Sequence, residues 1–326
     1  MIAQLDSEYM KIARTRTLVR LASYGLFEGR PATTKGRCVN GIVATQLRVA
    51  ARFWRNEEVD RPVFVVGMGR SGTTILGNIL GIHRKVGFLN EPKLLWQMAI
   101  DTQDVTGCYA QSGRFRLDAS DVSDTSRARM RKMYAWYTSF TRSQRVVDKY
   151  PEAIFRLKLI REIFPDAKVI AIARHADPVV RSITQWDDLH RTGLESWWGI
   201  RDAKWSQMLR ELVPREPRVQ AILATREISG VDRAVVEWIV SMREVLQARD
   251  AGVLNGLIRY EDFVADPRRV ISGILESAEL ECDKRVMQLS ETVVASREWT
   301  GKLASPYDES WLELTSPILH ALGYRA

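Results

Sequence analysis

The 326-residue sequence predicts one α/β domain with a central, mainly parallel sheet, helices on both of its faces and a helical extension at the N-terminus. Three observations support this prediction. Short apolar runs such as 63–66 and 168–173 have the composition of buried parallel strands. Longer segments with apolar residues at helical spacing alternate with these runs. No internal repeat or low-complexity segment interrupts the alternation.

The elements can be assigned in order along the chain. Residues 1–60 are expected to form a largely helical extension, broken near Gly29–Pro31, and residues 61–326 the main domain. Asp177 is expected to be the N-cap of a helix whose first residue is Pro178. The other expected elements are strands at 63–66, 146–148, 168–173 and 254–260, helices starting near 75 and 92 and spanning 123–141, 152–164 and 231–250, and a loop at 101–122. The segment 185–230 has no clear assignment.

The net charge of +8 is concentrated near the N-terminus. Between Lys11 and Arg55 there are ten basic residues and one acidic residue, Glu28, so this segment carries +9 and the remainder is close to neutral. A basic arm of this kind could contact a membrane surface, a nucleic acid or an anionic substrate. The alternative is a solvated helical extension without a partner.

Cysteine and histidine usage predicts no metal site. The three cysteines and four histidines show no metal-binding spacing, and the odd, scattered cysteines favour a reducing compartment. The sequence also lacks a secretory signal and any apolar run approaching the ~18 residues that span a bilayer. We therefore expect a cytoplasmic protein, with residues 11–55 as the segment that could reach a membrane.

A glycine-rich segment, Gly67–Thr74, directly follows the first predicted strand and precedes a helical pattern. This arrangement makes an anion cradle, because glycines let backbone N–H groups converge and a helix N-terminus adds positive potential. Gly67 and Gly72 have the spacing of the P-loop of kinases and GTPases, but Thr73 stands where that loop has its lysine. An ATP or GTP site would lack the lysine that contacts the β- and γ-phosphates. A purely structural turn remains the alternative.

The segment from Pro62 to Thr74 resembles the 5′-phosphosulfate loop of sulfotransferases that use 3′-phosphoadenosine-5′-phosphosulfate (PAPS) as donor. Arg70 before Ser-Gly-Thr-Thr is typical of the tyrosylprotein branch and several bacterial branches. The resemblance implies a P-loop-like three-layer fold and PAPS as the sulfuryl donor. It further implies that Arg70 stabilises the bridging oxygen, and that the donor's 5′ end is held by Gly69, Arg70, Ser71, Gly72, Thr73 and Thr74.

A second group of residues follows the predicted strand at 168–173. Arg174 ends this strand and Ser182 lies eight residues later, with Asp177-Pro178 between them. The pattern resembles the 3′-phosphate motif of the same family. An arginine fork and a hydroxyl can hold a phosphate dianion through charge-assisted hydrogen bonds. Taken alone, Arg174 could equally pair with a neighbouring carboxylate.

Sulfuryl transfer to a hydroxyl needs a base and cations that balance the leaving group. Glu91 lies 21 residues after Arg70, at a place that corresponds to the catalytic glutamate of related branches, although it could instead cap the helix at Pro92. The resemblance also implies that Lys149 lies near the transferred group, although a surface lysine is the alternative. It implies donor contacts from Tyr260 and from Lys302 in a late loop.

Four tryptophans, Trp186, Trp197, Trp198 and Trp205, lie close together among basic residues. Aromatic rings stack on sugars and the neighbouring cations suit an anionic glycan, so a carbohydrate or glycolipid acceptor is expected, whereas core packing is the alternative explanation. No nucleic-acid partner is expected. Two other functions compete: a P-loop kinase or NTPase, and a non-enzymatic protein whose basic arm binds membrane or nucleic acid. The order of the motifs favours the sulfotransferase.

Overall fold

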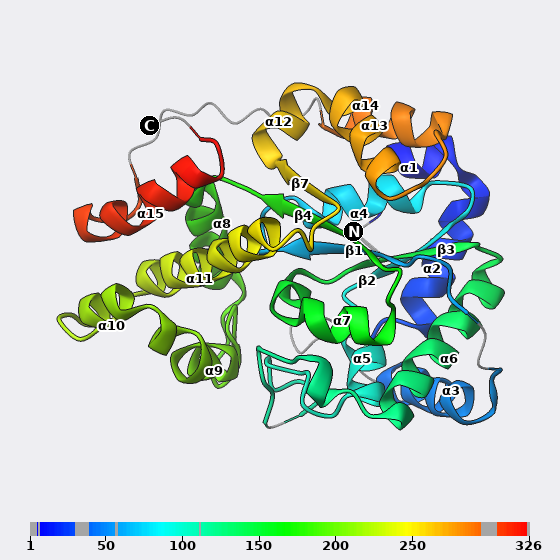
Figure 1. Ribbon diagram of the computed structural model, residues 1–326, viewed down its shortest axis with the longest axis horizontal. Coiled ribbons are helices and arrows are strands. Elements are labelled where there is room, and N and C mark those ends of the chain that lie inside the picture. The colour runs from blue at the N-terminus through cyan, green and yellow to red at the C-terminus, as the bar shows by residue number, and fades with distance from the viewer. Residues whose placement is uncertain are drawn as a thin grey trace.

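A five-stranded parallel sheet forms the centre of the molecule (Figure 1). The structure, a computed structural model, describes residues 5, 7–29, 39–55, 58–110, 112–294 and 305–324. The strands lie in the order β2-β3-β1-β4-β7, and all four pairings are parallel. They are β1 (Val63–Gly67), β2 (Val86–Asn90), β3 (Arg145–Lys149), β4 (Lys168–Ala173) and β7 (Gly256–Arg259). The predicted α/β class is confirmed.

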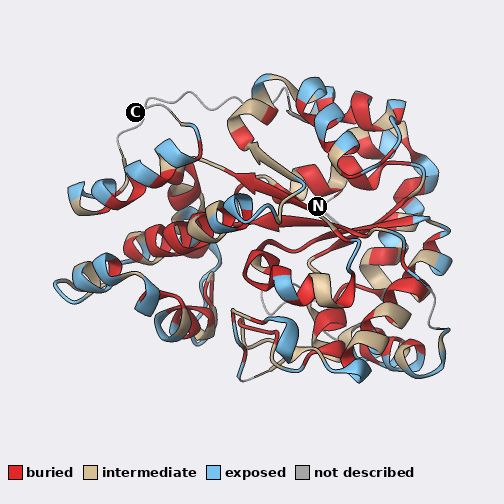
Figure 2. Cartoon of the chain, in the orientation of Figure 1, coloured by how far each residue is buried: buried red, intermediate tan, exposed pale blue. Residues whose placement is uncertain are grey.

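Alternate residues of β1 supply the two faces of the sheet, as successive side chains of a strand must. Val63 and Val65 pack into one buried cluster, Phe64 and Val66 into another. Helices on the first face are α1 (Ser7–Ile12), α4 (Thr73–Gly81), α12 (Tyr260–Ala265), α13 (Pro267–Ser277) and α14 (Lys284–Val294). Those on the second are α3 (Asn40–Phe53), α5 (Lys93–Ala99), α6 (Asp124–Thr141), α7 (Leu157–Ile163), α8 (Ala176–His190), α11 (Gly230–Asp250) and α15 (Glu309–Ala321). Figure 2 shows β1 to β4 almost entirely buried between these layers, whereas the edge strand β7 is half-buried.

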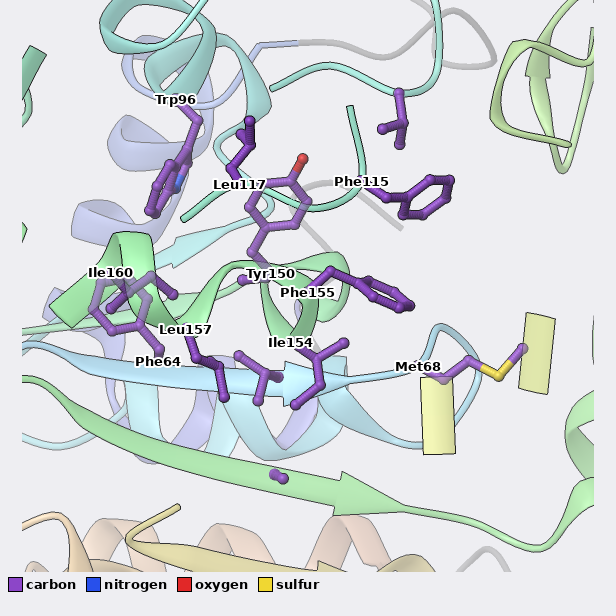
Figure 3. Close-up of a cluster of buried hydrophobic side chains, with 14 of the residues drawn as sticks. Phe64, Met68, Trp96, Phe115, Leu117, Tyr150, Ile154, Phe155, Leu157 and Ile160 are labelled. Atoms are coloured by element: carbon purple, nitrogen blue, oxygen red, sulfur yellow. The ribbon is translucent and has the colours of Figure 1, made fainter. Parts of the chain in front are cut away.

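Aromatic residues fill the second face beside β1 (Figure 3). The ring of Trp96 from α5 lies 6.2 Å from Phe64 and 6.1 Å from Tyr150, measured between centroids. Tyr150 leads into a 3-10 helix, Pro151–Arg156, which continues into α7. At the other end of this cluster, Phe115 and Phe155 approach edge to face with centroids 5.2 Å apart. These two rings reach the cavity described below.

Helix α2 (Arg14–Leu26) packs against β2, the edge strand of the sheet, and covers its unpaired side. Two arginines of the basic N-terminal segment, Arg16 and Arg20, are therefore buried. Arg20 pairs with Glu28 inside the protein, at 2.5 and 3.0 Å. Glu28 also accepts a hydrogen bond from the backbone N–H of Asn90, and the Ser23 hydroxyl donates to the Phe88 carbonyl. These side chains satisfy backbone groups that an edge strand leaves open.

Strand β2 was not predicted, because Gly87 and Asn90 weaken its β-propensity and two basic residues precede it. The predicted cap of α8 was also wrong. The N-cap is His175, whose Nδ1 accepts from the Asp177 N–H at 3.3 Å. The carboxylate of Asp177 instead accepts the Ser305 hydroxyl, so it is occupied by a distant segment.

The segment 185–230 folds into short elements that extend beyond the sheet. They are the hairpin β5 (Glu195–Ser196) and β6 (Gly199–Ile200), and the helices α9 (Ala203–Glu211) and α10 (Pro217–Leu223). The expected helix at 152–164 is split into the 3-10 turn and α7, and the last predicted strand ends at Arg259 because α12 starts at Tyr260. Over the described ranges, no helix is long and apolar enough to cross a bilayer.

Candidate active site

Each strand of the sheet has a predicted site residue at its carboxyl end. The glycine loop follows β1, Glu91 follows β2, Lys149 ends β3, Arg174 follows β4 and Tyr260 follows β7. Because the strands are parallel, these ends meet at one edge of the sheet, where open α/β sheets bind ligands. The sheet order therefore brings together residues up to 193 positions apart in the sequence (from Gly67 to Tyr260).

Two positions of the glycine loop require glycine, both because of a positive φ and because a Cβ would meet a close neighbour. Gly67 has φ +141°, and a Cβ there would lie 2.4 Å from the Ile172 carbonyl oxygen of β4. Gly72 has φ +90° and is the N-cap of α4, and a Cβ there would lie 2.4 Å from Tyr260 Cδ2. The amides of Thr73, Thr74 and Ile75 at the start of α4 precede the first intrahelical hydrogen bond, which the Leu76 amide donates to the Gly72 carbonyl at 3.1 Å. They are available to an anion at the loop.

A buried hydroxyl in this loop also lacks a partner. Within the described part of the chain, no hydrogen-bond partner is found for Ser71 Oγ, although the side chain is fully buried. Buried polar atoms in native proteins are nearly always satisfied by protein, water or ligand. Ser71, together with the amides of α4, thus fits a ligand that brings several acceptor oxygens, such as a phosphosulfate.

The loop meets the second predicted motif directly. Arg70 Nε donates to Ser182 Oγ on α8 at 2.8 Å, and Arg174 Nη1 donates to the carbonyl of Arg70 at 3.0 Å. The Arg174 guanidinium stacks over the ring of Tyr260, 4.1 Å from its centroid, and its buried Nε has no partner among the described residues. Two motifs that are more than one hundred residues apart in sequence are therefore joined directly by hydrogen bonds.

Tyr260 is buried, and its ring packs against Gly72 of the loop and against the guanidinium of Arg174. The ring therefore contacts both motifs. Lys302, the remaining residue predicted to contact the donor, lies outside the described residues.

Glu91 and Lys149 form an ion pair with Nζ and Oε1 2.5 Å apart. The Lys149 side chain is 2% exposed, whereas that of Glu91 is 38% exposed and reaches the cavity. Glu91 has φ +50°, in the left-handed region that few non-glycine residues adopt. Helix α5 begins after Pro92 without a side-chain cap, so the Glu91 carboxylate serves the ion pair and does not cap the helix.

The electrostatic environment keeps Glu91 ionised. Burial acts to raise its pKa, but the charges of Lys149 and Lys93 outweigh burial, and the pKa of Glu91 lies below its usual value. Glu91 is therefore a carboxylate at neutral pH, the form that a general base requires.

Sequence analysis missed a row of alternating charges that continues from Glu91 into the cavity. Lys93 Nζ lies 3.7 Å from Glu91 Oε2 and 3.3 Å from Glu152 Oε1. Lys204 Nζ then lies 3.6 Å from Glu152 Oε1 and 2.6 Å from Glu237 Oε1. Despite burial, which favours the neutral amine, Glu152 and Glu91 raise the pKa of Lys93 well above its usual range. These residues belong to separate elements and no spacing in the sequence links them.

The glycine loop, Glu91 and the charged row line a cavity of about 340 Å³. Trp186 and Trp197 line it too, with ring centroids 5.3 Å apart, and Trp197 Nε1 donates to Glu237 at 3.0 Å. Trp198 and Trp205 do not: both are buried in the core, with Arg233 beside their rings. Two of the four predicted acceptor tryptophans thus face the site, and two pack in the interior.

No group of three or more metal-binding side chains is found among the residues that the structure describes. The charged side chains that line the cavity are one arginine, two lysines and four glutamates: Arg70, Lys93, Lys204, Glu91, Glu152, Glu195 and Glu237. Within this set, Arg70 and the backbone amides of the glycine loop can bind an anion, and the Glu91 carboxylate can accept a proton.

Comparisons with known proteins identify the family and the fold. A family model described as "Sulfotransferase family" matches residues 62–226, which include the glycine loop, Glu91, Lys149 and Arg174. A search of curated protein sequences returned no match.

Solved structures with a similar fold carry related descriptions. A sulfotransferase domain from the curacin biosynthetic pathway aligns with a TM-score of 0.51 at 17% identity, over 82% of this chain and 99% of that one. A sulfotransferase of Mycobacterium tuberculosis H37Rv aligns with a TM-score of 0.49 at 15% identity, over 97% and 93%. The sulfotransferase domain from the Synechococcus PCC 7002 olefin synthase aligns with a TM-score of 0.48 at 16% identity, over 84% of this chain and 100% of that one. At 17% sequence identity, the alignment with the curacin-pathway domain shows a similar fold and nothing further.

Proposed function

The chain belongs to the sulfotransferase family, and we propose that it transfers a sulfuryl group from PAPS to a hydroxyl of a carbohydrate or glycolipid. The observation that carries this proposal is the junction of two motifs at Arg70. Its side chain bonds Ser182 and its carbonyl bonds Arg174, so the loop and the second motif form one surface. PAPS has phosphate groups at both its 5′ and 3′ ends, whereas ATP has none at the 3′ position.

The donor would be held at its two ends by different residues. The amides at the start of α4 and the hydroxyls of Ser71, Thr73 and Thr74 suit the 5′ end. Arg174 and Ser182 suit the 3′-phosphate, and in support the Nε of Arg174 has no partner among the described residues. When bound, PAPS supplies an activated sulfuryl group, and Arg70 offers positive charge where negative charge develops on the leaving oxygen.

Glu91 is the proposed general base. It is ionised at neutral pH, partly exposed to the cavity and fixed by Lys149, so it can accept a proton from a hydroxyl that enters beside it. Lys149 positions this carboxylate by holding Oε1, and its buried ammonium also adds positive charge next to the loop. Since the pKa of Glu91 is lowered, base function would be lost only on the acid side of about 4.5.

Trp186 and Trp197 support the carbohydrate or glycolipid acceptor, because their rings line the cavity next to the charged row. Sugars bind between aromatic faces and paired polar groups, and both are present here.

The donor is tested by thermal unfolding with PAP, the desulfated donor product, against AMP and ATP, without metal. A ligand at a hundredfold excess over its Kd stabilises the native state by about 2.7 kcal/mol. We expect PAP to raise the unfolding temperature well above the value with AMP. An equal response to PAP and AMP would remove the support for a 3′-phosphate site, and a larger response to ATP would favour a kinase.

The base is tested by transfer from radiolabelled PAPS with Glu91→Gln. We expect loss of transfer by about 10²- to 10⁴-fold, with PAP affinity retained. Glu276→Gln, an exposed residue on α13, is the matched control. Full activity in a folded Glu91→Gln protein would rule out the base assignment.

A further inference from the structure

Helix α3 carries a row of large apolar side chains that face outward. Ile42, Val49 and Phe53 are 61%, 54% and 76% exposed, values that are unusual for such residues. They are seven and four positions apart, so they lie on one side of the helix. We call these three side chains the α3 ridge. None of them lines the cavity of the active site.

The ridge is separate from the face by which α3 joins the fold. Val43, Leu47 and Ala50 are buried in the core cluster, where α3 packs against α5 and α6. At 100° per residue, the ridge is turned by about 100° from this inward row. α3 therefore uses one stripe for folding and presents a second apolar stripe to solvent. The helix lies at the periphery of the molecule (Figure 1).

The surface beside the ridge is positively charged. Residues 40–55 contain three arginines, Arg48, Arg52 and Arg55, and no acidic residue. All three arginines are exposed, and Arg48 and Arg52, one turn apart, form a third stripe on α3. Arg129 from α6 is exposed nearby and lines the same hollow as Arg48 and Arg52.

The space next to the ridge is itself apolar. A groove runs between α3 and Trp136 of α6, and Trp54 contributes its indole ring to the same wall. The two indole centroids lie 6.3 Å apart. Protruding apolar side chains, tryptophans and a flanking row of arginines form the combination with which helices lie in the interface of an anionic bilayer.

We propose that the α3 ridge and its arginines dock the protein on the surface of a membrane that contains anionic lipid. The apolar side chains enter the acyl boundary and the arginines contact lipid phosphates. Charge complementarity favours this occupant over a second copy of the chain. A two-fold symmetric contact through the ridge brings the same surface against itself, so Arg48 and Arg52 of the two copies would repel.

The test is co-sedimentation of the full chain with vesicles of phosphatidylcholine alone or with 30% phosphatidylserine. We expect binding to the anionic vesicles only, decreasing as salt rises. Removing Arg48 and Arg52 as R48Q/R52Q should weaken binding by about 25-fold, at about fivefold per charge near the surface. Ile42→Ser with Phe53→Ser should weaken it by at least tenfold.

Matched controls separate this surface from general charge and hydrophobicity. Arg268→Gln with Arg269→Gln removes two exposed charges from α13, and Leu189→Ser removes an apolar side chain that is 80% exposed on α8. Both control proteins should bind as the wild type does. Thermal melts and PAP affinity should be unchanged in the α3 variants, which establishes that they fold.

Three outcomes would overturn the proposal. The first is absence of binding to anionic vesicles. The second is equal binding to vesicles of phosphatidylcholine alone, which would leave the arginines without a role. The third is a dimer in analytical ultracentrifugation that dissociates on Phe53→Ser, which would identify the ridge as a contact between two copies.

Discussion

Replacing Asp148 with asparagine is expected to remove a pH-dependent penalty on folding. Asp148 lies in β3, fully buried, and its Oδ2 accepts hydrogen bonds from the Tyr134 hydroxyl and, at 2.9 Å, from Trp96 Nε1. No partner is found for Oδ1 in the described residues. Burial raises the pKa of Asp148 from 3.8 to about 7, and the two hydrogen bonds only partly offset it. The folded protein thus holds a proton that the unfolded chain releases near pH 4.

The sign and size follow from linkage between protonation and folding. Since the folded pKa lies above the unfolded pKa, Asp148 destabilises the fold increasingly as pH rises from about 4 to about 7. One pKa unit corresponds to about 1.4 kcal/mol, so the penalty grows by about 3 kcal/mol between pH 5 and pH 8. Asparagine keeps an acceptor for both donors and carries no charge. Relative to the wild type, Asp148→Asn should gain about this amount over the same range.

Urea unfolding at pH 5, 6, 7 and 8 measures this difference, with Asp188→Asn, an exposed position on α8, as the control. The difference in unfolding free energy between Asp148→Asn and the wild type should grow with pH and level off above about pH 7. Parallel pH profiles for the two proteins would refute the reasoning, because Asp148 would then be ionised or protonated equally in both states.

Two further predictions concern the active site. Gly72→Ala should weaken PAP binding by at least tenfold in calorimetry, because φ is +90° and the new Cβ would meet Tyr260 at 2.4 Å. Gly273→Ala in α13, where a Cβ has open space, should bind PAP normally and be slightly more stable. Trp198→Ala should lower the unfolding free energy by about 3–5 kcal/mol, since Trp198 is fully buried. Trp186→Ala should chiefly reduce transfer to the acceptor, and equal loss of stability in both tryptophan variants would contradict the division between lining and core residues.

Local patterns predicted the parts of the site that are continuous in sequence. The strand before Gly67, the loop to Thr74 and the helix after it are specified by neighbouring residues, so their arrangement follows from composition and backbone conformation. Arg174 lies beside the loop because β1 and β4 are paired and both motifs follow their strand ends.

The missing parts depend on contacts between distant segments. Strand β2 is held at the edge by α2 and by Tyr137, whose hydroxyl donates to the Phe88 carbonyl at 2.8 Å. His175 displaced Asp177 as a cap because Ser305, 128 residues away, engages the Asp177 carboxylate. Lys204 and Glu237 appear in sequence as ordinary helix residues, and only packing shows that they face each other in a cavity.

The row of alternating charges also limits how this enzyme could change through mutation. Each member contacts the next, from Lys149 and Glu91 to Lys204 and Glu237, so an altered charge at the far end leaves a neighbour unpaired in a buried place. The unpaired charge would in turn disturb the ion pairs of Glu91, the proposed base. A change of acceptor preference at this side of the cavity would therefore require two compensating substitutions of opposite charge. A single charge substitution would lower stability or activity and be selected against.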